Sequence, residues 1–180
     1  MQNKKKMLEL AELANVHSKL VLNLLNTITA CSHMKILPGR LYGQYGGPYV
    51  EVYSITPCLE ERVRKILTAK INPYSVGLHV ATIKKRGVTP SLDLAKYVTR
   101  KCKSSDYRHA MVSPKGEQAF LYGRDVFKNN IIETPEDEGL LIVLNTRKEP
   151  LGWGYLKRED GKELLIENIK DVGWYVRSGG

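Results

Sequence analysis

The sequence predicts an α+β fold in two parts: an N-terminal α/β sandwich-like domain, residues 1–105, and a C-terminal mixed β-barrel, residues 106–180. Two observations support this prediction. Helix-type and strand-type segments alternate in the first part, whereas the second part has a short strand, one helix and then several β-rich segments separated by Gly and Pro. The boundary is placed in the short polar segment 103–106.

The first part opens with a predicted helix. Hydrophobic residues recur at three- and four-residue steps over residues 7–28, as on an amphipathic helix. β-Branched and aromatic residues predict a strand over residues 49–55. Pro57 suits the first turn of a second helix, which ends before Asn72.

Alternating apolar residues predict a further strand over residues 76–82, which leads into the basic turn 84–87, Lys-Lys-Arg-Gly. The next segment, 91–100, allows two interpretations. The proline before it favours the start of a helix, whereas Leu92 and Leu94 fit the alternation of a strand.

The segment 114–126, PKGEQAFLYGRDV, is the most informative stretch of the chain. The turn Ser113-Pro114-Lys115-Gly116 opens a short helix that starts with Glu117, whose charge suits the positive N-terminal end of a helix. Gly123 is placed to end that helix. The β-rich segments GLLIVLN, EPLGWGYLK and DVGWYVRSGG follow, with a hairpin turn predicted at Asp160-Gly161.

This order of elements resembles a PUA domain, the RNA-binding module named after pseudouridine synthases and archaeosine transglycosylases. The motifs EQAFLYG, PLGWG and DVGWYVR, at these distances, resemble the Nip-seven (nuclear import protein seven) family of ribosome-biogenesis factors, in which an α/β pre-PUA domain precedes a PUA domain. The resemblance is specific over residues 104–177 and implies an archaeal member. One departure is the segment 128–131, Lys-Asn-Asn-Ile, where many PUA domains carry a Pro-Gly-Ile type of turn; Asn tolerates the left-handed backbone that such a turn needs.

Composition is that of an ordinary globular protein, with 42% hydrophobic and 26% charged residues. The sequence holds no apolar run long enough for a membrane span, and Glu9 and Glu12 interrupt the apolar core that a signal peptide needs. We therefore expect a cytoplasmic protein, or a nucleolar one if the source is eukaryotic, with no membrane partner. Cys31, Cys58 and Cys102 are widely spaced, so we expect buried thiols rather than a disulfide framework or a zinc site.

The net charge of +9 is distributed unevenly. Residues 1–105 hold 17 Lys/Arg against 6 Asp/Glu, an excess of +11, whereas residues 106–180 hold 11 against 13, a balance of −2. A basic excess of this size attracts phosphate backbones or acidic partners. The PUA-like part must instead rely on local clusters of basic residues.

No group of residues predicts catalysis. The four histidines are scattered, and none has the spacing of a metal site. The glycine-rich segment 43–47 follows no predicted strand and lacks the Lys-Ser/Thr of a phosphate-binding loop. We expect no catalytic residue, no metal and no cofactor.

The resemblance implies that RNA lies along the short helix, the loop after it and the last strand, which here are Gln118, residues 122–128 and residues 174–177. Arg124 suits a phosphate clamp and suits equally an ion pair with Asp125 or a cap on the helix carbonyls. Trp153 is expected in the core. The candidate RNA-binding residues are Lys84, Lys85, Arg86, Arg124, Lys128, Arg147, Lys157, Arg158, Lys162, Trp174 and Arg177.

Three of these candidates, Lys157, Arg158 and Lys162, would converge at the tip of the predicted hairpin. The acidic residues there, Glu159, Asp160 and Glu163, could instead neutralise their charge. Trp174 is expected to be exposed, as a stacking surface for a base or as an anchor for a partner protein. The expected function is a non-catalytic, monomeric RNA-binding adaptor in large-subunit ribosome assembly, which binds single-stranded, U- or A/U-rich pre-rRNA and other biogenesis proteins. The alternatives are a protein–protein assembly factor and a targeting subunit of an RNA-modifying or RNA-degrading complex.

Overall fold

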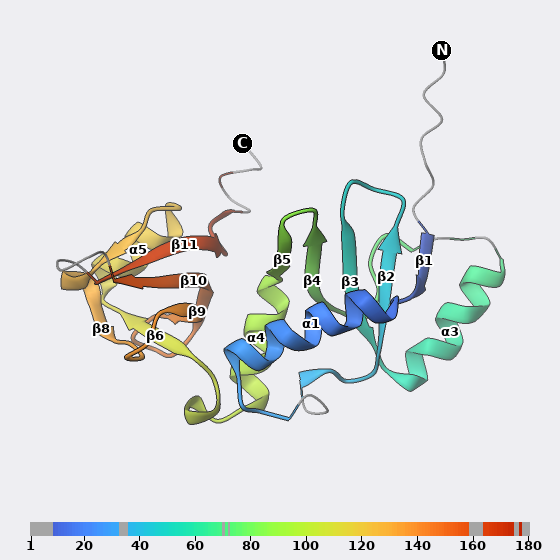
Figure 1. Ribbon diagram of the computed structural model, residues 1–180, viewed down its shortest axis with the longest axis horizontal. Coiled ribbons are helices and arrows are strands. Elements are labelled where there is room, and N and C mark those ends of the chain that lie inside the picture. Colours follow the sequence, from blue (N-terminus) through green and yellow to red (C-terminus); the bar gives the residue numbers. More distant parts are fainter. Residues whose placement is uncertain are drawn as a thin grey trace, which may run out of the picture. The chain divides into compact units, whose positions relative to one another are not determined.

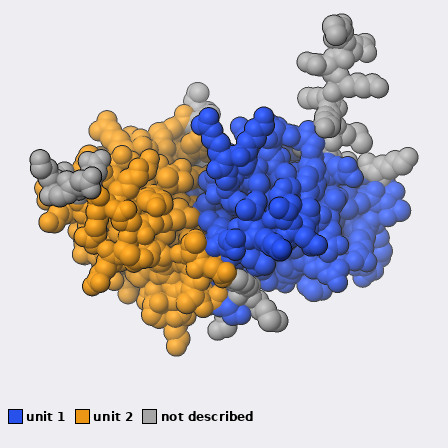
Figure 2. Space-filling view, in the orientation of Figure 1, with its two compact units in different colours: residues 1–25, 32–94 blue, residues 26–31, 95–180 orange. Residues whose placement is uncertain are grey.

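The computed structural model describes residues 9–32, 36–69, 71, 73–158, 164–174 and 177 (Figure 1). The chain forms two compact units (Figure 2). Unit 1 comprises residues 1–25 and 32–94, and unit 2 comprises residues 26–31 and 95–180. The chain therefore contributes a short segment to unit 2 long before the rest of that unit begins.

Unit 1 is built on a five-stranded antiparallel sheet in which each strand pairs with the next one along the chain. Its strands are β1 (Glu9–Glu12), β2 (Arg40–Tyr45), β3 (Val50–Ile55), β4 (Leu78–Lys84) and β5 (Gly87–Pro90). Helix α3 (Pro57–Thr68) lies in unit 1, as does most of α1 (Asn15–Ile28), whereas α4 (Leu92–Lys101) begins in unit 1 and lies mostly in unit 2. Leu10, Tyr42, Tyr53, Ile55 and Val63 form a buried cluster between α3 and the sheet.

One long helix over residues 7–28 was the wrong prediction for the start of the chain. Residues 9–12 form the edge strand β1, paired with β2, and α1 begins only at Asn15. In β1 Leu10 is buried, whereas Glu9 and Glu12 are exposed. A single buried leucine fits the apolar spacing of a helix as well as the alternation of a strand, so it did not distinguish the two. The predicted strand over 49–55 and the helix from Pro57 are confirmed as β3 and α3.

The open question at residues 91–100 is answered by α4. Ser91 precedes this helix, and its side-chain oxygen accepts a hydrogen bond from the backbone N–H of Leu94 at 2.9 Å. A serine in this position satisfies one of the free N–H groups of the first helical turn. The cap therefore favours the helix over the strand.

Unit 2 is a six-stranded, nearly closed mixed sheet, which confirms the predicted α+β class and its C-terminal barrel. In spatial order the strands are β7 (Val126–Phe127), β11 (Leu164–Asp171), β10 (Pro150–Arg158), β9 (Gly139–Leu144), β6 (His109–Val112) and β8 (Ile131–Glu133). Strands β6 and β9 are parallel and the other neighbours are antiparallel. Helix α5 (Pro114–Leu121) and the 3₁₀ turns Ser104–Asp106 and Lys128–Asn130 connect them.

The interior of unit 2 is apolar. Phe120 of α5 and Trp153 of β10 are fully buried, which confirms the core role expected for Trp153. Gly152 lies where β10 bends against β11, with a φ of +155°, and an added Cβ there would lie 2.1 Å from the carbonyl oxygen of Lys170. Only glycine allows the two backbones to approach so closely, which explains the glycine of the PLGWG motif.

The end of α5 follows the predicted signal at Gly123, whereas its start lies at Pro114, inside the stretch 113–116 that was expected as a turn before Glu117. The Ser113 side chain accepts a hydrogen bond from the Gly116 N–H at 3.2 Å, as an N-cap does. Gly123, with a φ of +76°, ends the helix in a left-handed conformation. The Lys128–Asn130 segment turns as a 3₁₀ helix, and neither asparagine has a positive φ.

The chain after β11 does not continue as the expected last strand. Strand β11 ends at Asp171, Val172 and Gly173 form a turn, and Trp174 and Arg177 have helical backbone. Trp174 and Arg177 are therefore not part of a strand; Tyr175 and Val176 lie outside the described residues. The buried carboxylate of Asp171, which binds Arg177, favours the turn because it draws the chain back.

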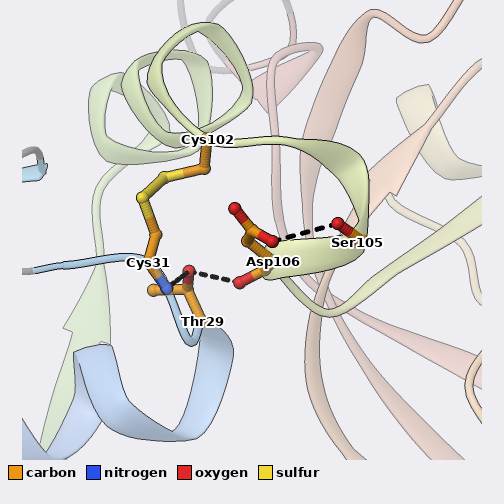
Figure 3. The surroundings of a disulfide bond; sticks show 5 residues. All are labelled: Thr29, Cys31, Cys102, Ser105 and Asp106. Carbon is orange, nitrogen blue, oxygen red and sulfur yellow. Dashed lines mark hydrogen bonds between the residues drawn. A yellow bond between two sulfur atoms is a disulfide. The ribbon is translucent and has the colours of Figure 1, made fainter.

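A disulfide bond joins Cys31 and Cys102, whose Cα atoms lie 6.0 Å apart (Figure 3). The expectation of free buried thiols was therefore wrong for these two residues, and the free Cys58 is exposed. The cysteines meet because segment 26–31 lies along the start of the C-terminal part. There the Thr29 hydroxyl donates to the Asp106 carbonyl at 2.6 Å. Because 71 residues separate the two cysteines, their spacing gave no sign of the pairing.

None of the helices within the described ranges is both long and apolar enough to cross a membrane.

Candidate nucleic-acid interface

Helix α5 and the residues directly after it carry an exposed polar face. Lys115, Gln118 and Tyr122 lie at three- and four-residue steps along one side, and Arg124 follows the helix end. Tyr122, at the C-terminal end of the helix, is 64% exposed, whereas tyrosines are on average intermediate in burial. The face therefore presents an aromatic ring together with two cations.

Two hollows border this tyrosine. The larger, of about 470 Å³, is mostly apolar and is lined by Pro114, Glu117, Gln118, Leu121, Tyr122, Gly173 and Arg177. The smaller, of about 320 Å³, is lined by Lys115, Gln118, Ala119, Tyr122 and Arg124. Gln118 and Tyr122 thus line both hollows.

Arg124 does not pair with its neighbour Asp125. The carboxylate of Asp125 accepts a hydrogen bond from the Asn168 N–H at 2.8 Å. The Arg124 backbone N–H caps the helix by donating to the Ala119 carbonyl at 3.0 Å. The guanidinium forms no ion pair with any residue in the described ranges, and it borders the smaller hollow. The ion pair with Asp125, one of the three roles expected for Arg124, is therefore excluded.

Arg177 is exposed, but its guanidinium is bound within the protein. Its guanidinium donates to both carboxylate oxygens of Asp171, at 3.0 and 2.8 Å, and also to the carbonyl oxygen of Leu121 at the end of α5. The hydrogen bonds to Asp171, which is 2% exposed, raise the pKa of Arg177 above its ordinary value. Arg177 thus lines the larger hollow and links Asp171, at the end of β11, to the end of α5.

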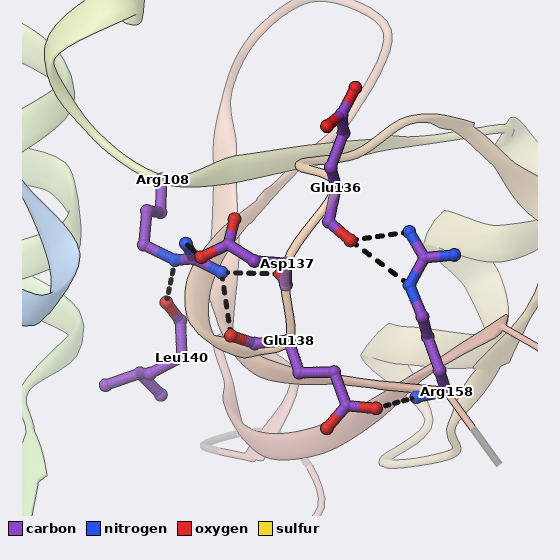
Figure 4. A network of polar contacts seen from close by, with 6 residues as sticks. All are labelled: Arg108, Glu136, Asp137, Glu138, Leu140 and Arg158. Carbon is purple, nitrogen blue, oxygen red and sulfur yellow. Dashed lines mark hydrogen bonds and ion pairs between the residues drawn. The ribbon is translucent and has the colours of Figure 1, made fainter. Parts of the chain in front are cut away.

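The predicted basic hairpin forms between β10 and β11, but its cations are largely bonded within the protein. The Lys157 ammonium pairs with Glu167 at 2.6 Å. Arg158 donates to the Glu136 carbonyl at 3.1 and 2.6 Å, and its backbone N–H donates to Glu138 (Figure 4). Lys162 and the acidic residues at the hairpin tip lie outside the described residues.

The same loop, residues 136–138, is held from its other side by Arg108. Its guanidinium bonds to the carboxylate and carbonyl of Asp137 and to the carbonyls of Glu138 and Leu140 (Figure 4). The hydrogen bond from Arg108 lowers the pKa of Asp137 below its ordinary value. The two arginines of this region therefore fix a loop that sequence patterns did not single out.

The remaining candidates of unit 2 are spread over separate elements. Arg147, in the β9–β10 turn, pairs with Glu149 at 3.0 Å. Hydrogen bonds from Asn145 and then from Arg147 lower the pKa of Glu149. Lys128 is exposed in its 3₁₀ turn, and Trp174 is 50% exposed. The RNA contacts assigned to these residues remain predictions.

The candidates of unit 1, Lys84, Lys85 and Arg86, are exposed at the β4–β5 turn. Lys115 was missed from the sequence, and Tyr122 lay in the mapped stretch without being chosen as a candidate. The sequence did contain a pattern that could have identified these residues. Lys115, Gln118 and Tyr122 recur at three- and four-residue steps, and Gly123 follows them directly.

The part of the chain that the structure describes contains no group of three or more His, Cys, Asp or Glu side chains able to hold a metal ion.

The six-stranded mixed sheet, its short helix and the exposed helix face define a PUA-domain protein, and residues 108–180 match the family described as the UPF0113 PUA domain. The chain belongs to the UPF0113 family. It is 36% identical over 135 residues to a UPF0113 protein of Aeropyrum pernix, with 75% of this chain and 73% of the relative covered. A UPF0113 protein of Archaeoglobus fulgidus is 25% identical over 140 residues, with coverage of 73% and 75%.

Solved structures share the fold at low sequence identity. A hypothetical protein of Pyrococcus horikoshii aligns with a TM-score of 0.60 at 14% identity, covering 93% of this chain and 99% of that one. A conserved PUA-domain protein of Thermoplasma acidophilum aligns with a TM-score of 0.56 at 12% identity, covering 94% and 99%. All these relatives come from archaea, which supports an archaeal origin for this chain.

Proposed function

We propose that this protein is a non-catalytic adaptor that holds single-stranded RNA on the exposed face of α5. The observation that carries the proposal is Tyr122, which is 64% exposed and lines two neighbouring hollows. Unpaired bases stack on flat aromatic rings whatever their identity, which contributes about 1–3 kcal/mol per base. The two hollows give room for the flanking nucleotides.

The charges around this ring suit a phosphate backbone. Lys115 and Arg124 line the smaller hollow together with Tyr122. The Arg124 guanidinium has no ion pair in the described ranges, so binding a phosphate would cost it no existing charged partner. Glu117, the acidic residue of the larger hollow, already accepts a hydrogen bond from Asn145 at 3.2 Å. Phosphates are therefore expected on the Arg124 side.

The finer role rests on the sequence motifs. EQAFLYG, PLGWG and DVGWYVR resemble the Nip-seven family, which supports a role in assembly of the large ribosomal subunit, with pre-rRNA and other biogenesis proteins as partners. We propose a monomer that works in the archaeal cytoplasm and prefers U- or A/U-rich RNA. The proposed domains remain residues 1–105 and 106–180.

A titration with labelled single-stranded RNA tests the proposal. Oligo(U) of about ten nucleotides is titrated with the wild type, Tyr122→Ala, Tyr122→Phe and the double variant Lys115→Ala/Arg124→Ala. We expect Tyr122→Ala to weaken binding at least fivefold, which is the lower end of one stacked base, and Tyr122→Phe to retain most of it.

The matched control for charge is Lys19→Ala/Lys96→Ala, which removes two exposed lysines from α1 and α4. If this control weakens binding as much as Lys115→Ala/Arg124→Ala does, attraction to overall charge explains the affinity and the α5 face is not the site. Equal affinity of Tyr122→Ala and wild type would also reject the proposal.

A second candidate function, a protein–protein assembly factor or targeting subunit, is favoured by the exposure of Trp174. A tryptophan that is 50% exposed is a typical anchor for a partner protein. In that case Trp174→Ala would break a pull-down of biogenesis factors from archaeal extract and leave oligo(U) affinity unchanged. A loss of oligo(U) affinity instead would place Trp174 in the RNA site.

A further inference from the structure

Unit 1 carries a second cluster of exposed basic and aromatic side chains, at one end of its sheet. The β2–β3 and β4–β5 connections lie at the same end of the sheet (Figure 1). Tyr49 belongs to the first connection, and Lys84, Lys85 and Arg86 belong to the second. The register that pairs Val50 with Ile83 brings Tyr49 next to Lys84.

The contact between these two connections is direct. The Lys84 ammonium lies 5.4 Å from the centroid of the Tyr49 ring, within the range of a cation–π interaction. The ring nevertheless stays 48% exposed, so a large part of its surface is open. A ring that contacts a cation and is also open to solvent is positioned to stack on a base whose phosphate meets that cation.

The positive charge of this cluster is not neutralised within the described ranges. None of Lys84, Lys85 and Arg86 forms an ion pair there, whereas Lys157, Arg147 and Arg177 of unit 2 all do. The acidic residue near the cluster on β3, Glu51, hydrogen-bonds with Thr82 at 2.7 Å and His79 at 2.8 Å. Lys85 and Arg86 form a two-residue turn closed by the pairing of Lys84 with Gly87.

The backbone of this turn is open as well. An added Cβ on Gly87 would meet no atom within 4 Å. The space beside Gly87 is therefore open, as the exposed side chains of Lys84, Lys85 and Arg86 are. The whole region 1–105 has an excess of +11, so long-range attraction favours the same ligand class as the local cluster.

We infer that Tyr49, Lys84, Lys85 and Arg86 form a second binding site for single-stranded RNA, separate from the α5 face. We call it the hairpin-tip site. The choice of RNA as its ligand rests on the proposed function. Its residues are independent of the α5 face, because none of them belongs to that face. Two sites on one chain would raise the affinity for RNA that is long enough to reach both, since the second contact becomes intramolecular.

The test uses the full chain and oligo(U) of about six and about thirty nucleotides. The variants are Tyr49→Ala, Tyr49→Phe and the triple variant Lys84→Ala/Lys85→Ala/Arg86→Ala. The control, Lys19→Ala/Arg62→Ala/Lys96→Ala, removes the same charge from exposed positions on three helices. We expect the hairpin-tip triple variant to weaken binding of the longer RNA roughly tenfold or more and the control to weaken it far less.

Stacking is tested separately from charge. Tyr49→Ala should weaken binding at least fivefold, and Tyr49→Phe should stay close to wild type. Photo-cross-linking of 4-thiouridine RNA should also mark peptides with residues 46–50 or 84–87. All four side chains are exposed, so we expect the melting temperatures of the variants to be unchanged. This measurement shows that the variants are folded.

The failure of this inference differs from failure of the α5 face. If Tyr122→Ala weakens binding but the hairpin-tip variants match the control, the hairpin-tip site is rejected and the α5 site stands. If only the hairpin-tip variants weaken binding, the α5 site is rejected instead. Poly-glutamate and unlabelled oligo(U) are compared as competitors. If poly-glutamate displaces the labelled RNA equally well, the surface binds anions without selectivity and the inference is overturned.

Discussion

Arg177 and Asp171 form a two-pronged ion pair that closes the C-terminal end of the PUA domain onto α5. The two terminal nitrogens of the guanidinium each donate to one oxygen of a carboxylate that is 2% exposed. The same guanidinium donates to the Leu121 carbonyl, which belongs to the last helical turn. A residue that the family pattern placed on the RNA face thus serves to shape that face.

Replacing Arg177 tests this structural role. Arg177→Ala leaves the buried Asp171 carboxylate without its partner, so we expect a clear drop in melting temperature. Arg177→Lys should restore little, because an ammonium cannot make the paired bonds of a guanidinium. Calorimetry measures both, with Arg147→Ala as the control because its ion pair with Glu149 is exposed. A melting temperature for Arg177→Ala equal to that of the control would contradict the role.

The salt dependence of RNA binding should separate phosphate contacts from stacking. For single strands each phosphate contact adds about 0.7 to the slope of log affinity against log salt concentration. Lys115→Ala/Arg124→Ala should lower that slope by about 1.4, whereas Tyr122→Ala should lower affinity at every salt concentration and leave the slope unchanged. Fluorescence anisotropy at four salt concentrations provides the measurement. A reduced slope for Tyr122→Ala would show that the ring positions a cation rather than a base.

The disulfide should contribute strongly to stability. A cross-link over 71 residues removes chain entropy from the unfolded state worth about 4 kcal/mol in the loop-closure model. Cys31→Ser/Cys102→Ser should lower the free energy of unfolding by roughly that amount, as measured by chemical denaturation. Adding dithiothreitol should destabilise the wild type and leave the double variant unaffected. Cys58→Ser is the control, since that thiol is exposed and free.

Acid should weaken unit 1 through Glu60. Its carboxylate accepts hydrogen bonds from Tyr42 at 3.0 Å and Arg64 at 2.8 Å, and Arg40 lies 3.6 Å away. The bond from Tyr42 and then the bond and charge of the arginines lower the pKa of Glu60 below its ordinary value of 4.5, against the opposing effect of burial. Burial, followed by the bond to Glu60, raises the pKa of Tyr42.

A carboxylate whose pKa is lower in the folded state stabilises the fold above about pH 4.5, and this contribution is lost as the pH falls through the folded pKa. Glu60→Gln should therefore melt at a lower temperature than wild type at pH 7, and the difference should shrink toward pH 3. Glu61→Gln, which removes an exposed ion pair with Lys65, is the control and should have little effect at either pH. A difference that is the same at pH 3 and pH 7 would contradict the explanation.

Local signals in the sequence predicted the part of the fold that is determined locally. Gly123 marked the end of α5, and the turn at Pro114 marked its start to within about three residues, because helix ends depend on residues within one turn. Leu10 misled the prediction because a strand at the edge of a sheet depends on a partner, β2, about thirty residues away. Arg177 was assigned to RNA because its position in the motif could not reveal the buried carboxylate that binds it.

The candidate site was predictable in outline and not in its residues. The motif located the helix, yet which side of α5 faces solvent is set by Phe120, which is buried in the barrel and leaves Tyr122 outside. Lys157 and Arg158 were attractive by charge alone, but Glu167 and the Glu136 carbonyl bind them. Pairing across strands decides which cations stay available, and a single sequence does not contain that information.

The bond between Cys31 and Cys102 also gives the chain an unusual tolerance of backbone cleavage. A protease that cuts once anywhere between residues 32 and 101 separates two peptides, of which one holds Cys31 and the other Cys102. The exposed connection 46–49 lies within that interval. Cleaved molecules would thus migrate as one species on a denaturing gel until a reductant separates the two fragments. The disulfide would keep the fragments covalently linked although the backbone is cut.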